Sequence, residues 1–165
     1  MLELRKLKLL VCLVLILACF ASRAQTLQID DVFKAYSLDS VDLKQFCLEK
    51  KFHLNEVSED SYRSTQTYQS DDNNKISFVR TFPKRGTSVF FYYYFDDQYE
   101  YKNFKKLIKT KGFKYDRSYE MFPNSKQSDY RERYNSDKLT FELGTSNFGN
   151  SRYFVLLYSR LDEHL

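Results

Sequence analysis

The feature that most constrains this chain is a helical pattern followed by several strand patterns, which occurs twice. Apolar residues recur at helical spacing over 41–51 and again between Asp97 and Gly112. After each of these segments the apolar period changes to two, which predicts four strands separated by short polar turns. The predicted strands cover 53–58, 62–69, 75–82 and 88–96 in the first half, and 114–121, 128–135, 138–144 and 152–160 in the second.

Local signals mark the ends of both predicted helices. Asp97 followed by Glu100 is the pattern of a capping box, and Gly112 is typical of the residue just after a helix. In the first half we expect Asp39 or Ser40 as the cap, while Lys51 stands where the second half has its glycine. A further turn of helix is expected over 30–36.

The two halves can be aligned with each other. At an offset of 61 residues, Leu43, Phe46, Cys47 and Phe52 fall on Phe104, Leu107, Ile108 and Phe113. At 63, residues 75–78 fall on 138–141, and at 64, Phe90 and Tyr94 fall on Phe154 and Tyr158. This predicts an α+β fold of two tandem helix-plus-four-strand repeats, about 30–96 and 97–160, forming one antiparallel sheet with the helices on one face.

The last strand of each repeat is predicted to lie at the centre of the sheet. Residues 89–95 (VFFYYYF) and 153–158 (YFVLLY) are apolar on both faces, which would promote aggregation at an exposed edge. The resulting topology over 30–160 resembles that of the β-lactamase-inhibitory protein family, which is secreted. The resemblance implies the fold and not an inhibitory activity. That family stabilises its repeats with disulfides, whereas this body contains only Cys47.

Residues 1–24 predict a secretory signal peptide. A basic start is followed by an apolar run over 9–20, which as a helix spans about 18 Å, less than the roughly 30 Å of a bilayer core. Small residues at Ser22 and Ala24 predict cleavage before Gln25, leaving residues 25–165 as a single periplasmic or secreted domain. Alternatively, residues 16–19 resemble a bacterial lipobox, and lipidation of Cys19 would anchor the chain in the cell envelope.

Composition excludes several functions. Four of the 26 basic residues and one of the 22 acidic residues lie in the signal peptide, so the body is nearly neutral and gives no reason to expect nucleic-acid binding. The only histidines are His53 and His164, and no metal, phosphate-loop or nucleophile motif is present. We therefore expect no catalytic residue, metal or cofactor, and a packing role for Cys47 on the apolar side of its helix.

Aromatic residues make up 18% of the chain, more than one small core needs, and they suggest a binding surface on the open sheet face. The candidate binding residues are Tyr62, Tyr68, Tyr92, Tyr94, Tyr130 and Tyr158, extended by Arg80, Lys84 and Arg85. The resulting hypothesis is an exported, non-catalytic module that binds a protein or another envelope component. The alternatives are a lipid-anchored structural protein, which alone would contact the membrane, and an envelope hydrolase.

Overall fold

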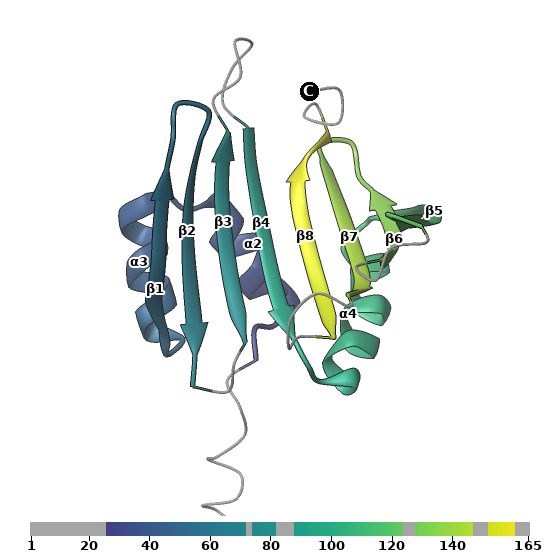
Figure 1. The fold of residues 1–165 in the computed structure, drawn as a ribbon. Coiled ribbons are helices and arrows are strands. Elements are labelled where there is room, and N and C mark those ends of the chain that lie inside the picture. Colours follow the sequence, from purple (N-terminus) through teal and green to yellow (C-terminus); the bar gives the residue numbers. More distant parts are fainter. Residues whose placement is uncertain (1–25, 72–73, 82–87, 124–127, 147–151, 161–165) are drawn as a thin grey trace, which may run out of the picture.

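The computed structural model describes residues 26–71, 74–81, 88–123, 128–146 and 152–160. In this part of the chain, three helices lie on one face of a single open antiparallel sheet (Figure 1). The helices are α2 (Ile29–Ser37), α3 (Ser40–Glu49) and α4 (Gln98–Thr110). The predicted α+β class, with one antiparallel sheet and helices on one face, is confirmed.

The sheet has eight strands in the order β1-β2-β3-β4-β8-β7-β6-β5. The first four are β1 (Phe52–Glu59), β2 (Arg63–Ser70), β3 (Lys75–Thr81) and β4 (Ser88–Phe95). The others are β5 (Lys114–Met121), β6 (Asp129–Asn135), β7 (Leu139–Ser146) and β8 (Tyr153–Ser159). All eight predicted strands are present, and the two most apolar ones, β4 and β8, pair at the centre as expected.

Each half of the sheet is a four-stranded meander that follows a helix, and the halves share local details. The residue two positions after α3, Lys51, has φ 56°, and Gly112 in the same place after α4 has φ 83°. A bulge interrupts the edge strand β1 between Leu54 and Glu56, and another interrupts the edge strand β5 between Tyr115 and Arg117. These details are compatible with a tandem repeat.

The main core lies between the helices and the sheet. It contains Leu43, Phe46 and Cys47 of α3, Phe104 and Ile108 of α4, and alternate residues of the central strands, such as Phe91 and Tyr93. Cys47 is fully buried, as predicted, and burial raises the pKa of its thiol to about 12. The buried hydrophobic residues extend from Leu27 to Tyr158, so residues 26–160 contain a core of their own.

Helix α2 covers the helical segment expected over 30–36 and extends it by one residue at each end. It has nine residues, and Val32 and Ala35 are completely buried. The helix contacts β4, β8 and α4, and the ring of Phe33 lies 5.5 Å from that of Phe113. It therefore packs where the two halves of the sheet meet, and no helix in the described part of the second half corresponds to it.

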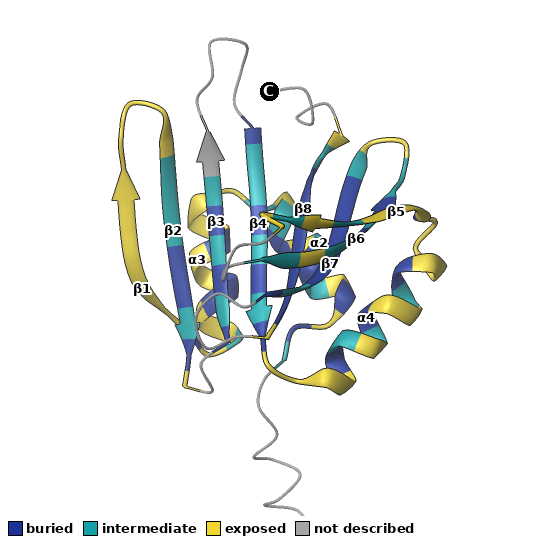
Figure 2. Ribbon diagram, turned by 45° about the vertical axis from the view of Figure 1, so that its right-hand side comes forward, coloured by how far each residue is buried: buried dark blue, intermediate teal, exposed yellow. Residues whose placement is uncertain are grey.

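The sheet is strongly curved. In Figures 1 and 2, β5 and β6 turn out of the plane of the other strands, toward the side that carries no helix. That side, which we call the open face, is consequently concave beside β8. Among the described residues, no helix is both long and apolar enough to cross a membrane.

Candidate functional site

The open face carries a second hydrophobic cluster, separate from the main core. Because side chains alternate along a strand, Phe91, Tyr93 and Phe95 point to the helices while their neighbours on β4 point away. The open-face cluster consists of Phe90, Tyr92 and Tyr94 of β4 with Phe154, Leu156 and Tyr158 of β8. The three β8 residues are buried and the three β4 residues are half-buried (Figure 2).

The rings of this cluster hold one another in place. Tyr92 and Tyr94 stack with centroids 6.0 Å apart and planes at 5°, and Tyr94 lies 6.2 Å from Phe154. Phe90 lies 5.6 Å from Tyr158 across the β4–β8 ladder. Burial raises the pKa of Tyr92 and of Tyr94, so both hydroxyls stay protonated at neutral pH. The cluster is a rigid aromatic surface with neutral hydrogen-bonding groups.

Gly144 of β7 makes room for one of these rings. It pairs with Phe154, and a Cβ at position 144 would lie 2.5 Å from Cζ of that ring and would also collide with the carbonyl oxygen of Tyr130. The sequence pattern places Gly144 at the start of a turn, but the strand continues to Ser146. This glycine is required by the packing of Phe154 rather than by a turn.

A charged network borders the cluster on the β5–β7 side. Its centre is the carboxylate of Glu142, which is 1% exposed. Oε1 accepts hydrogen bonds from the hydroxyls of Tyr119, at 2.6 Å, and Tyr158, at 3.0 Å. The same oxygen accepts from Arg133 Nε at 2.9 Å, while Oε2 accepts from Arg131 Nη1 at 3.0 Å.

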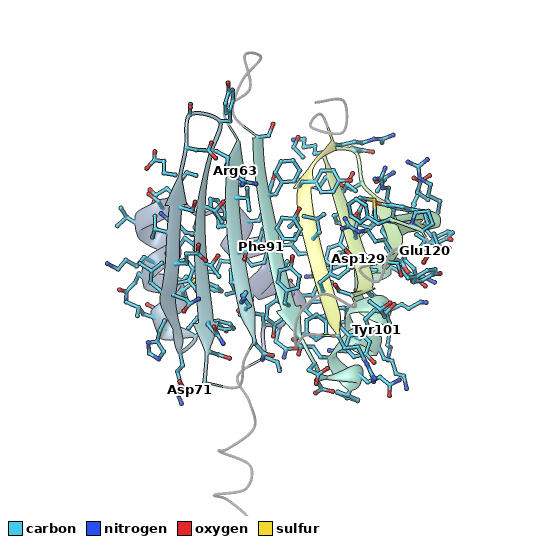
Figure 3. All side chains as sticks on the ribbon, viewed as in Figure 1. Arg63, Asp71, Phe91, Tyr101, Glu120 and Asp129 are labelled. Carbon is cyan, nitrogen blue, oxygen red and sulfur yellow. The ribbon has the colours of Figure 1, made fainter. Side chains whose placement is uncertain are left out.

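The network fixes two arginines beside the aromatic cluster. Arg131 also pairs with Asp129 at 3.2 Å, and its guanidinium lies 5.0 Å from the centre of the Phe154 ring. Asp129, which is labelled in Figure 3, is the first residue of β6. Oδ1 of Asp129 and Nε of Arg131 are buried without a hydrogen-bond partner. One donor and one acceptor therefore remain next to the cluster.

Glu142 is held as an anion. Burial alone would raise the pKa of Glu142, but its hydrogen bonds from Tyr119 and Arg131 and the two arginine charges lower it overall. A carboxylate with this environment is a poor proton donor. Its role in the site is to orient Tyr119, Tyr158 and the arginines.

The structure brings three of the predicted binding residues together, Tyr92, Tyr94 and Tyr158. Tyr68 lies in the main core and is 1% exposed, so its assignment to the open face is wrong. Tyr130 is 44% exposed but pairs with Thr145 on the helix-facing side of β6, and Tyr62 is 76% exposed between β1 and β2. We expected part of the six tyrosines to form a contiguous exposed patch. Three of them do lie together, but of these Tyr158 is buried and Tyr92 and Tyr94 are half-buried.

Several other sequence predictions lie outside the described part of the structure. They are Lys84, Arg85, the side chain of Arg80, the signal peptide over 1–24 and the lipidation candidate Cys19.

Sequence reasoning missed half of the open-face cluster and all of its border. The missed residues are Phe90, Phe154, Leu156, Glu142, Arg131 and Arg133. Successive side chains of a strand point to opposite faces of the sheet, and β4 and β8 are apolar at both odd and even positions. This pattern could have identified Phe90, Phe154 and Leu156 as part of a second apolar face. No pattern along the chain links Glu142 to the arginines, which come from a neighbouring strand.

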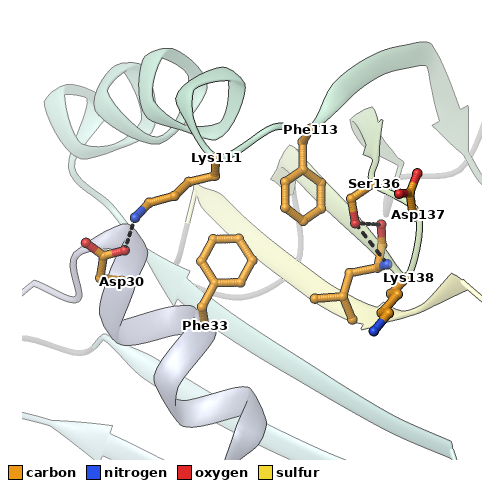
Figure 4. Close-up of a pocket in the computed structure, with 8 residues that line it drawn as sticks. Asp30, Phe33, Lys111, Phe113, Ser136, Asp137 and Lys138 are labelled. Carbon is orange, nitrogen blue, oxygen red and sulfur yellow. Dashed lines mark hydrogen bonds and ion pairs between the residues drawn. The ribbon is translucent and has the colours of Figure 1, made fainter.

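A groove lies on the opposite side of the molecule, where the helices are (Figure 4). It has a volume of about 530 Å³ and lies between α2, the end of α4 and the turn from β6 to β7. Phe33, Phe113 and Leu139 line it, and Lys111 forms an ion pair with Asp30 at its rim. Asp137 and Lys138 complete a rim of alternating charge, which does not select a ligand of either sign.

No group of three or more metal-ligating side chains occurs among the described residues. Comparison with protein families, curated proteins and solved structures gives no match. The resemblance to β-lactamase-inhibitory proteins therefore stays a topological expectation from the sequence.

Proposed function

We propose that this protein is an exported, non-catalytic module that binds a protein partner through its open face. The observation that carries the proposal is the separate aromatic cluster on the face without helices, bordered by Arg131 and Arg133. Tyrosine, phenylalanine and arginine are among the residue types enriched at the centres of protein interfaces.

The rigidity of this surface supports the same proposal. Rings that already stack, and arginines already fixed by Glu142, lose little conformational entropy when a partner binds. The hydroxyls of the half-buried Tyr92 and Tyr94 can accept or donate hydrogen bonds to a partner.

A photo-crosslinking side chain at position 92 tests this function in the exporting cell. We expect a covalent adduct with one defined protein, identified by mass spectrometry. Matched positions are 62 and 99, whose tyrosines are both 76% exposed and lie away from the open face. Absence of an adduct at 92, or the same adducts at all three positions, would contradict binding through this face.

The alternative is a lipid-anchored protein with a structural role in the envelope. This alternative rests on the sequence around Cys19. The mass of the chain recovered from the cell distinguishes it from the exported module. A chain that begins at Gln25 supports the exported module, whereas a chain that begins at an acylated Cys19 supports the anchored protein.

A further inference from the structure

The side of α4 that faces away from the sheet is basic. It carries Lys102, Lys106 and Lys109, which we call the outer lysines and which follow one another at spacings of four and three residues along the helix. All three are exposed, and Figure 2 shows this side of α4 as exposed. The buried residues of the helix lie on its opposite side. By contrast, the corresponding helix of the first half, α3, contains one lysine, Lys44.

The charges of the outer lysines are not neutralised by the described part of the protein. Two neighbouring lysines do have acidic partners, since Lys105 pairs with Glu132 and Lys111 pairs with Asp30. None of the outer lysines forms an ion pair with a described residue. The one acidic residue within α4 is Glu100, which is buried on the other side of the helix. The outer side of α4 therefore presents three positive charges to the solvent.

An exposed tyrosine lies on the same side of α4. Tyr99 precedes Lys102 by three residues and Lys106 by seven, and these spacings place all of them on one face of a helix. Tyr99 is 76% exposed and belongs to neither hydrophobic cluster of the described residues. Tyrosine is favoured at the headgroup level of membranes, where its ring is in an apolar layer and its hydroxyl is in water.

We propose that α4 docks this protein on an anionic lipid surface through Tyr99 and the outer lysines. The ammonium groups approach the phosphates of the lipid headgroups, and the tyrosine ring enters the boundary between headgroups and acyl chains. A lysine near such a surface strengthens binding about fivefold, so the three together supply roughly a hundredfold. The apolar side of α4 stays in the main core, so docking requires no change of fold.

Docking through α4 leaves the open face available to a partner. The helices and the open-face cluster lie on opposite sides of the sheet (Figure 1), so a protein held by α4 directs its open face away from the lipid. The inference goes beyond the proposed binding of a partner and does not depend on it. The sequence suggests membrane contact only for the lipidated form, whereas α4 gives such a contact to a chain without a lipid.

Binding of residues 25–165, which contain the whole described core, to lipid vesicles tests the docking. The probes are vesicles of phosphatidylglycerol and phosphatidylcholine in equal parts, and vesicles of phosphatidylcholine alone. The test variant changes the three outer lysines to glutamine. The control variant changes Lys44, Lys51 and Lys138 to glutamine; these lysines are also exposed and form no ion pair with a described residue, so both variants lose the same charge.

We expect the parent chain to bind the anionic vesicles and not those of phosphatidylcholine alone. The test variant should bind the anionic vesicles at least tenfold more weakly than the parent, and the control variant less than threefold more weakly. Salt at about 1 M, which shortens the Debye length to about 3 Å, should release the parent. Urea unfolding should give the same stability for all three chains, because every substituted lysine is exposed.

A fluorescent label that responds to its environment shows which side of the molecule meets the lipid. Because Cys47 is buried, the label reacts with a cysteine introduced as Tyr99→Cys or, as the control, as Tyr62→Cys, positions whose tyrosines are both 76% exposed. We expect a blue shift on anionic vesicles at position 99 and none at position 62. Equal loss of binding in the two lysine variants, or equal shifts at the two positions, would overturn the docking. Binding to soluble dextran sulfate without binding to the vesicles would overturn it too, in favour of an anionic polysaccharide.

Discussion

Lys51 and Gly112 occupy the same position after α3 and α4, yet only one of them is a glycine. Both have positive φ, 56° for Lys51 and 83° for Gly112. A side chain disfavours this conformation, and glycine adopts it freely. The lysine is therefore a strained residue at a helix end.

Replacing Lys51 with glycine should stabilise the protein by about 1 kcal/mol, because it removes this conformational strain. Urea unfolding measures the change. Gly112→Ala is the reciprocal control and should destabilise by a similar amount, since a Cβ there meets no atom within 4 Å and only the backbone is strained. If Lys51→Gly lowered stability, contacts of the lysine chain would outweigh the strain.

Gly144 is required for a different reason, the ring of Phe154 that lies against it. Gly144→Ala should cost on the order of 2 kcal/mol, because the ring and the β6 backbone must both move. Thermal unfolding measures the loss. In a chain that already carries Phe154→Leu, Gly144→Ala should lower the stability by less than it does in the parent chain. Simple additivity of the two substitutions would show that the ring is not the obstacle.

At the scale of single elements, the Asp97 cap is the clearest local determinant of α4. Its carboxylate accepts the N–H of Tyr99 at 2.7 Å, one of the helix N–H groups that lacks a partner within the helix. Asp97→Ala should therefore destabilise by about 1 kcal/mol. Asp96→Ala, at the exposed neighbouring position, is the control for the loss of charge. An equal effect of both substitutions would assign the loss to charge rather than to capping.

The elements themselves follow largely from local patterns. Clean alternation of apolar and polar residues, as in Ile76-Ser77-Phe78, fixes both the strand and its buried side. Ile76 and Phe78 lie in the core on the helix side of the sheet, together with Phe141 and Leu157 of the other half. Helix α2 was expected within one residue of its bounds, but its central position comes from packing against β4, β8 and α4, which spacing along the chain does not show.

The candidate site was harder to predict because it depends on which face each tyrosine occupies. In β2 (RSTQTYQS) neither the odd nor the even positions are clearly apolar, so nothing in the sequence shows that Tyr68 points to the core. Tyr130 and Tyr134 are four positions apart in β6 and therefore lie on the same face of the strand. Tyr134 is buried in the main core, so Tyr130 also lies on the helix side. The network around Glu142 joins four strands, β5 to β8, and such contacts are set by register and curvature rather than by spacing along the chain.

At the scale of the whole molecule, the two halves are joined by one strand pair and by α2. The β4–β8 ladder runs from Phe90–Tyr158 to Phe95–Tyr153, and its side chains contribute to both the main core and the open-face cluster. Helix α2 contacts both of these strands. Neither half therefore has a complete core without the other.

Because of this shared core, the protein should unfold in one cooperative transition, and damage to α2 should weaken both halves together. Val32 is fully buried, so Val32→Ala should destabilise by about 2 kcal/mol. Hydrogen exchange should show the same loss of protection in β2 and β6, which lie in different halves. Leu48→Ala, at an exposed position of α3, is the control and should change neither. Protection lost in one half alone, or two separate transitions, would mean that each half holds a core of its own and that α2 only covers the joint between them.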